Sequence, residues 1–237
     1  MLKIVNLTKK YKDKKAVDNL SLEVKPGEIF GFIGHNGAGK TTTIKSIVGI
    51  HDFDEGDILI DGISIKKDAI TCKKKIAYIP DNPDIYENLT GISYLNFVAD
   101  VFEIDEKTRK EKIEKYANMF EIKDNLKDVI SSYSHGMKQK LVIISSLIHS
   151  PKLLVLDEPF VGLDPKSTFL LKQIMKDMTK EGTAIFFSSH VLEVVEKLCD
   201  RIGIIKQGQL IKVGSVDEIK GDKSLEGVFL ELTENEK

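Results

Sequence analysis

The chain has 237 residues, of which 41% are hydrophobic and 30% are charged, and its formal net charge at pH 7 is −2. These values predict a globular protein with a substantial core, and the near balance of charges gives no indication of a polyanion partner. The two cysteines, Cys72 and Cys199, provide neither a metal-binding spacing nor a disulfide framework, which fits a reducing cytosol. No signal-peptide pattern is present, and no apolar run approaches the ~20 residues of a membrane-spanning helix, so we expect a soluble chain.

Apolar periodicity predicts two strands at the start of the chain, over residues 2–7 and 16–24. Leu20, Leu22 and Val24 alternate with polar residues, as expected of a strand with one face in water. Together the two strands predict an antiparallel edge lobe. Tyr11 falls in the predicted loop between them, where its ring could cover the end of the sheet or stack on a flat ligand.

Residues 34–41 fit the phosphate-binding pattern G-x-x-x-x-G-K-[ST]. Its glycines allow successive backbone N–H groups to point at phosphate oxygens, while Lys40 reaches the β and γ phosphates and the Thr41 hydroxyl ligates Mg²⁺. An apolar strand at residues 29–33 precedes the loop, and a helical stripe that ends at Gly49 follows it, as the pattern requires. The predicted nucleotide-binding residues here are Gly34, His35, Asn36, Gly37, Ala38, Gly39, Lys40, Thr41 and Thr42.

Further along the chain, the pattern alternates between strands and helices. Strands are predicted at residues 57–61 and 75–79, and a proline-rich break with Asp81 follows the second. Residues 87–150 read as an all-helical insert. After the insert we expect strands at residues 153–156, 184–187, 202–205 and 210–213, with helices beginning near Asp164 and Val191, and then a charged tail with an apolar cluster at Leu225, Val228 and Phe229.

Asp157 and Glu158 directly follow a buried strand, and His190 follows another. Ligands bind at the carboxyl ends of strands in open parallel sheets, so these residues are expected beside the phosphate loop. Asp157 is placed to hold the Mg²⁺ shell opposite Thr41, and Glu158 to act as the general base for an attacking water. His190 could donate a hydrogen bond to the γ-phosphate and help to orient the water.

Residues 133–140, Tyr-Ser-His-Gly-Met-Lys-Gln-Lys, open another apolar helix. Ser134 and Gly136 at a helix start could simply cap the helix. A helix N-terminus can also bind phosphate, and two such sites in each chain would suit two chains that sandwich nucleotide between them.

Taken in the order in which they occur along the sequence, these motifs resemble those of the nucleotide-binding subunits of ATP-binding cassette (ABC) transporters, and the resemblance covers almost the full length of the chain. The resemblance implies an α/β P-loop NTPase fold, with a RecA-like core, an antiparallel β subdomain and an inserted α-helical subdomain. It also implies that Tyr11 stacks on adenine and that the signature segment, Ser134, His135, Gly136 and Met137, contacts ATP held by the partner protomer. Asp164 would then link the two sites.

Three positions depart from the usual family pattern. Asp81 stands where the family generally has glutamine; an acid can still touch Mg²⁺ but cannot donate a hydrogen bond as an amide can. His135 replaces a glycine and Met137 replaces a glutamine within the signature segment. Such variants resemble subunits that pair with separate multi-spanning exporters of the ABC-2 type.

We therefore expect one ABC ATPase domain over residues 1–237, with residues 1–86 and 151–214 forming the core and β lobe, 87–150 the helical lobe and 215–237 a C-terminal tail. The expected function is that of an Mg²⁺-dependent ATPase subunit powering transport, with export favoured. The expected partners are a second copy or a similar cassette and a membrane permease that docks near residues 81–90, with no nucleic acid involved. This would place the chain peripherally on the cytoplasmic face of the membrane.

Two other functions remain open from the residues alone. One is a soluble cassette ATPase that acts on nucleic acid or protein machinery. DNA-repair relatives carry long coiled-coil insertions and translation-type relatives carry two cassettes, and this sequence has neither feature. The other is a small-molecule kinase, in which Glu158 and the signature segment would have no role.

Overall fold

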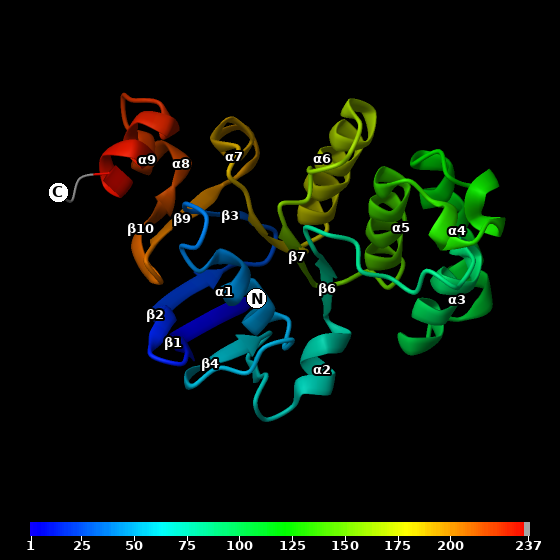
Figure 1. The fold of residues 1–237 in the computed structure, drawn as a ribbon, viewed down its shortest axis with the longest axis horizontal. Coiled ribbons are helices and arrows are strands. Elements are labelled where there is room, and N and C mark those ends of the chain that lie inside the picture. Colours follow the sequence, from blue (N-terminus) through cyan, green and yellow to red (C-terminus); the bar gives the residue numbers. More distant parts are fainter. Residues whose placement is uncertain (235–237) are drawn as a thin grey trace.

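The computed structural model describes residues 1–234, so the last three residues of the predicted tail, 235–237, lie outside the described part. Two β-sheets and a group of helices make up the fold (Figure 1). The antiparallel sheet lies at the lower left of the view, the larger sheet crosses the centre, and helices α3, α4 and α5 lie at the right. This is the mixed α/β P-loop NTPase fold that the sequence predicts.

The larger sheet has six strands in the order β10-β9-β3-β8-β7-β6. All neighbours are parallel except β10, which pairs antiparallel with β9. Strands β3, β7 and β8 are buried along their entire length, which explains their nearly continuous apolar sequences. The strands are β3 (Ile29–Ile33), β6 (Ile76–Ile79), β7 (Leu153–Asp157), β8 (Ala184–Ser188), β9 (Arg201–Lys206) and β10 (Gln209–Ser215).

The smaller sheet is antiparallel, with the order β2-β1-β4-β5, and it contains the two strands predicted at the start of the chain. Its strands are β1 (Leu2–Tyr11), β2 (Lys14–Val24), β4 (Glu55–Ile60) and β5 (Ile63–Ser64). The prediction that Tyr11 lies in a loop is wrong: it is the last residue of β1 and pairs with Lys14. The reversal needs only two residues because Lys12 adopts a left-handed conformation, with φ of 54°.

The helices are α1 (Lys40–Ile47), α2 (Ala69–Lys74), α3 (Gly91–Val101), α4 (Glu106–Met119), α5 (His135–Leu147), α6 (Pro165–Lys180), α7 (Leu192–Leu198), α8 (Val216–Lys220) and α9 (Leu225–Glu234). Side-chain N-caps explain where many of them begin: Thr90, Asp105, Ser134, Asp164 and Ser215 each accept a hydrogen bond from the backbone N–H three residues later. Within residues 1–234, no helix is both long and apolar enough to cross a membrane.

Buried apolar side chains form two clusters. One joins the antiparallel sheet and α1 to the larger sheet, and Phe30, Phe32 and Phe186 pack there ring against ring. The other contains apolar residues of α3, α4 and α5 together with those of α6, α7, α8 and α9. Helices α8 and α9 belong to this second core, so the apolar cluster in the tail is the buried side of a helix that the charged composition of this segment conceals.

His149 joins α5 to the larger sheet. Its ring stacks on Phe102 with centroids 3.7 Å apart, and its Nε2 donates a hydrogen bond to the Ile76 carbonyl oxygen over 3.1 Å. The other ring nitrogen is buried and has no hydrogen-bond partner among the described residues. Burial is the main cause that lowers the pKa of His149 to about 4.

We expect this histidine to make stability depend on pH. Because its folded-state pKa lies below the ordinary value of 6.5, the unfolded chain binds the proton more tightly, and stability is lost as the pH falls from 6.5 towards 4. Urea unfolding at pH 7.5 and pH 5 should show a loss of about 2 kcal/mol due to His149. His149→Leu should reduce this loss of stability. His135→Gln, which alters an exposed histidine, is the control and should leave the loss unchanged. Equal pH dependence in wild type and His149→Leu would contradict the assignment of the effect to His149.

Candidate functional site

The strand register brings the predicted site residues to one edge of the larger sheet. Phe32 of β3 and Asp157 of β7 both pair with Ser188 of β8, so these three strands end at nearly the same level. The phosphate loop leaves β3 at this level, Glu158 follows β7 and His190 follows β8. Residues more than 150 positions apart in the sequence therefore converge at one place, as expected for the carboxyl ends of parallel strands.

The phosphate loop packs closely against neighbouring backbone. A Cβ atom at Gly34 would lie 2.5 Å from the Ile205 carbonyl oxygen, and one at Gly39 would lie 2.4 Å from the Ala16 carbonyl oxygen. Gly39 also has φ of 112°, which disfavours any other residue. The loop ends in α1, whose first N–H groups and helix dipole favour an anion.

Lys40 is the buried cation of the loop. Its Nζ donates to the carbonyl oxygens of Gly34 and His35, over 2.6 and 3.2 Å. Burial lowers its pKa, while the charges of Glu158 and Asp157 act in the opposite direction. The ammonium group thus lies inside the loop with only neutral backbone partners, and a phosphate could take their place.

Asp157 is almost completely buried at the end of β7. Its Oδ1 accepts a hydrogen bond of 2.5 Å from the Ser188 hydroxyl, whereas Oδ2 has no partner in the described part of the chain. Burial raises the pKa of this carboxyl, and the Ser188 hydrogen bond offsets only part of the increase. A buried acceptor without a donor is costly, so this oxygen fits a site that is completed by a ligand.

Glu158 and His190 contact each other directly. His190 Nδ1 lies 2.9 Å from Glu158 Oε2, and the same oxygen accepts a hydrogen bond of 3.3 Å from the His190 backbone N–H. Glu158 has φ of 47°, an unusual value for a residue with a side chain. This strained backbone points the carboxylate into the cavity beside the phosphate loop, and the pairing with His190 holds it there.

The nucleotide-sized cavity beside the loop has a volume of about 680 Å³. Tyr11 lines its rim, half exposed, and Asp81 lines it from the loop after β6. Gln207 and Gly208 also line it, and sequence reasoning missed them. The Gly208 N–H donates to the Ala38 carbonyl oxygen over 2.8 Å, so this hairpin tip supports the phosphate loop; a Gln-Gly turn between two strands gives no such signal.

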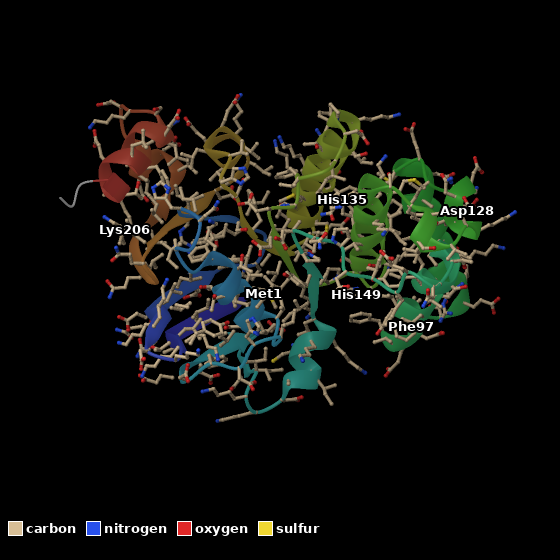
Figure 2. All side chains as sticks on the ribbon, in the orientation of Figure 1. Met1, Phe97, Asp128, His135, His149 and Lys206 are labelled. Carbon is tan, nitrogen blue, oxygen red and sulfur yellow. The ribbon has the colours of Figure 1, made fainter. Side chains whose placement is uncertain are left out.

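The signature segment does not reach this cavity. It lies at the start of α5, and Figure 2 shows His135 in the half of the molecule opposite Lys206. Ser134 caps α5 by accepting a hydrogen bond of 3.3 Å from the Met137 N–H. The structure therefore brings together the phosphate loop, Asp81, Asp157, Glu158 and His190, and leaves the signature segment apart.

The signature segment instead contacts the turn before α6. A Cβ at Gly162 would lie 2.5 Å from the His135 ring, so the histidine rests directly on this glycine. Lys140 of α5 forms an ion pair of 2.9 Å with Asp164. Hydrogen bonds from Ser167, reinforced by Lys140, lower the pKa of Asp164 well below its ordinary value. These contacts couple the signature helix to the turn that contains Asp164.

The donor set at the site suits magnesium held partly by a nucleotide. Within residues 1–234, no group of three or more His, Cys, Asp and Glu side chains lies close enough to hold a metal ion by itself. Thr41, Asp81 and Asp157 nevertheless line the same cavity, and all present oxygen atoms. Mg²⁺ prefers oxygen ligands and is commonly bound by one or two protein groups together with phosphates, so the unpartnered Asp157 Oδ2 fits such a site.

Comparison with known proteins identifies the family. The ABC transporter family profile matches residues 17–161. The uncharacterized ABC transporter ATP-binding protein YhcH of Bacillus subtilis is 39% identical, with 94% of this chain and 73% of that protein aligned. The linearmycin resistance ATP-binding protein LnrL of Bacillus subtilis is 36% identical, with 92% and 70% aligned.

Solved structures share the fold. An ATP-binding subunit of an ABC transporter superposes with a TM-score of 0.94 at 31% identity, over 98% of this chain and 99% of that one. A dimeric ATP-binding cassette, bound to ADP and Pi after hydrolysis, superposes with a TM-score of 0.83 at 23% identity, over 91% and 99%. By its sequence, its fold and the residues gathered at its phosphate loop, the chain belongs to the ABC transporter family as an ATP-binding subunit.

Proposed function

We propose that this chain hydrolyses Mg²⁺-ATP as one half of a closed dimer and that it transmits the resulting movement to a membrane permease. The observation that carries the proposal is the convergence at one cavity of Lys40, from the loop after β3, with Asp157 and Glu158, from the end of β7. A buried cation, a buried acid with a free oxygen and an oriented carboxylate are the groups that phosphoryl transfer to water requires.

In this proposal, Lys40 exchanges its two carbonyl partners for oxygens of the β and γ phosphates, and Tyr11 stacks on adenine at the rim. The Thr41 hydroxyl and the Asp157 carboxylate would hold Mg²⁺ together with phosphate oxygens of the nucleotide, and Asp81 would contribute a further oxygen from the loop after β6. The metal would supply positive charge next to the transferred phosphoryl group. Asp157 is suited to this role because Ser188 fixes one oxygen and leaves the other available.

Glu158 acts as the general base that takes a proton from the attacking water. His190 orients this carboxylate through the 2.9 Å contact, and we propose that it also donates a hydrogen bond to the γ-phosphate of bound nucleotide. The carboxylate keeps a small exposed fraction, so water can reach it while the backbone stays fixed.

A second copy of the chain, or a similar cassette, completes the site. Ser134 and Gly136 lie outside the cavity of their own chain, so they can contact the γ-phosphate only across an interface. His135 and Met137 would lie at the same contact, and Asp164 would link the two sites through Lys140. The dimeric cassette with ADP and Pi has the same fold, which supports this arrangement.

The permease is proposed to dock on residues 81–90. Tyr86 is 62% exposed and packs edge-on against Phe97 of α3, which is 46% exposed, with ring centroids 5.7 Å apart. This aromatic pair borders a shallow groove formed by residues 85–89 and Phe97, and Glu87 pairs with Lys138 of the signature helix. A partner there would bind next to the signature helix, from the cytoplasmic face of the membrane. The similarity to LnrL, a resistance protein by name, favours export.

Lys40→Ala should weaken ATP binding by roughly tenfold to a hundredfold, because the phosphates lose a charge-assisted donor. Calorimetry with Mg²⁺-ATP measures this directly. Lys45→Ala, at the other end of α1, is the matched control and should bind as wild type does. An unchanged ATP affinity of Lys40→Ala would contradict the assignment of Lys40 to phosphate binding.

Glu158→Gln should lower steady-state ATP turnover by at least about 10²-fold while ATP affinity stays close to that of wild type, since the amide cannot accept the proton from water. Phosphate release and calorimetry on the same preparation separate the two effects. Glu193→Gln, an exposed acid on α7, serves as control. Near wild-type turnover of Glu158→Gln would exclude it as the base.

Tyr86→Asp should abolish co-purification of the chain with an integral membrane protein and leave the turnover of the isolated chain unchanged, because the side chain lies outside the ATP cavity. Phe169→Asp, an equally exposed aromatic on α6, should not affect co-purification. Pull-down in detergent followed by identification of the captured protein tests this. Recovery of DNA or ribosomes would instead favour a soluble role.

A further inference from the structure

Helix α9 is amphipathic: one side packs against the core and another side is exposed. Its buried side consists of Leu225, Val228, Phe229, Leu232 and Thr233, at the i, i+3, i+4, i+7 and i+8 spacing of a core-facing helix. On another side, Glu226 and Leu230 are exposed one turn apart. Burial of the apolar side explains why α9 packs on the core. It does not explain why an apolar residue, Leu230, is exposed next to Glu226.

Phe229 connects α9 to the phosphate loop. Its ring lies against the ring of His35, with centroids 5.0 Å apart and planes inclined by 56°. His35 is exposed at the tip of the loop, so the contact joins the end of the described chain to the nucleotide site. The side of α9 that carries Phe229 therefore lies next to the phosphate loop.

Glu226 and Leu230 face a second cavity, of about 820 Å³. Glu158 and His190 also line it, and Val161 borders it from the turn after β7. Asn36, Asp81 and Glu158 line both this cavity and the nucleotide cavity. The two cavities are therefore adjacent, and α9 contributes to the wall of the second.

A second copy of the chain is the occupant that fits this space. ATP held by Lys40 places its γ-phosphate near Glu158, and the partner's signature segment can approach that phosphate only from the open side, where the second cavity lies. The wall side chains Asp81, Glu158 and Glu226 are acidic. The first turn of α5 contains no acidic residue, and its N-terminus carries positive partial charge, so the two surfaces are complementary.

We propose that α9 forms part of the interface of the ATP-bound dimer, with Leu230 and Glu226 contacting the partner copy and Phe229 anchoring the helix to the phosphate loop. This inference rests on the proposed function, because it assumes the nucleotide-dependent dimer. Leu230, which is 40% exposed in the single chain, becomes buried together with Val161 when the partner arrives. Helix α9 then contributes to dimer assembly as well as to the core.

The test measures dimer formation in the Glu158→Gln background, in which bound ATP persists. Sedimentation velocity with saturating Mg²⁺-ATP should give a dimer dissociation constant that rises roughly tenfold or more when Leu230→Asp is added, because a charge is then buried against apolar surface. Ile70→Asp on α2, a helix position with 72% exposure and no place in either cavity, is the matched control and should leave the constant unchanged. ATP affinity of the monomer, measured by calorimetry, should be equal in all three proteins.

The outcomes separate this inference from the function on which it rests. If the Glu158→Gln chain binds ATP but remains monomeric, the proposed dimer is wrong and the role of α9 is overturned with it. If that chain dimerises and Leu230→Asp dimerises equally well, the dimer stands and α9 is not part of its interface. If Leu230→Asp lowers the ATP affinity of the monomer as strongly as it lowers dimerisation, α9 acts on the nucleotide site and the interface role is overturned.

Discussion

The tight packing of the phosphate loop against backbone carbonyls is the constraint on which the rest of the structure depends. Gly34 lies against Ile205 of β9, and Gly39 lies against Ala16 of β2, with no room for a side chain at either place. The loop is thereby held by both sheets at once, and the Gly208 N–H supports it from the β9–β10 turn. Its N–H groups can stay directed at an anion only because these contacts fix the backbone before the anion binds.

The charged groups around the loop are arranged for a ligand, and two of them are costly to bury without one. Lys40 is buried against neutral carbonyls, and burial disfavours the ionised form of Asp157. Glu158 holds a left-handed backbone conformation beside His190. The two buried charged groups are unfavourable by themselves and would be stabilised by charged groups of a ligand, which is how a binding site can be built in advance of its ligand.

The signature helix α5 contacts the turn between β7 and α6. His135 rests on Gly162, and Lys140 pairs with Asp164, so the start of α5 is joined to the turn after β7 by two contacts. That turn follows Glu158 by only a few residues. A segment proposed to act on the partner's nucleotide is therefore in contact with the turn that follows the proposed general base of its own chain, and His135 makes one of the two contacts.

The sequence by itself determined the ligand class, the α/β P-loop fold and the candidate residues, because a phosphate loop is a local pattern and buried parallel strands have continuous apolar sequences. It also indicated that Asp157, Glu158 and His190 would meet, since strand ends share an edge. Only the tertiary structure decided that Glu158 pairs with His190, that Gly208 supports the loop and that α9 lies against His35. These contacts join segments that are distant along the chain, and no local periodicity or motif encodes a pairing that depends on how two separately formed elements pack.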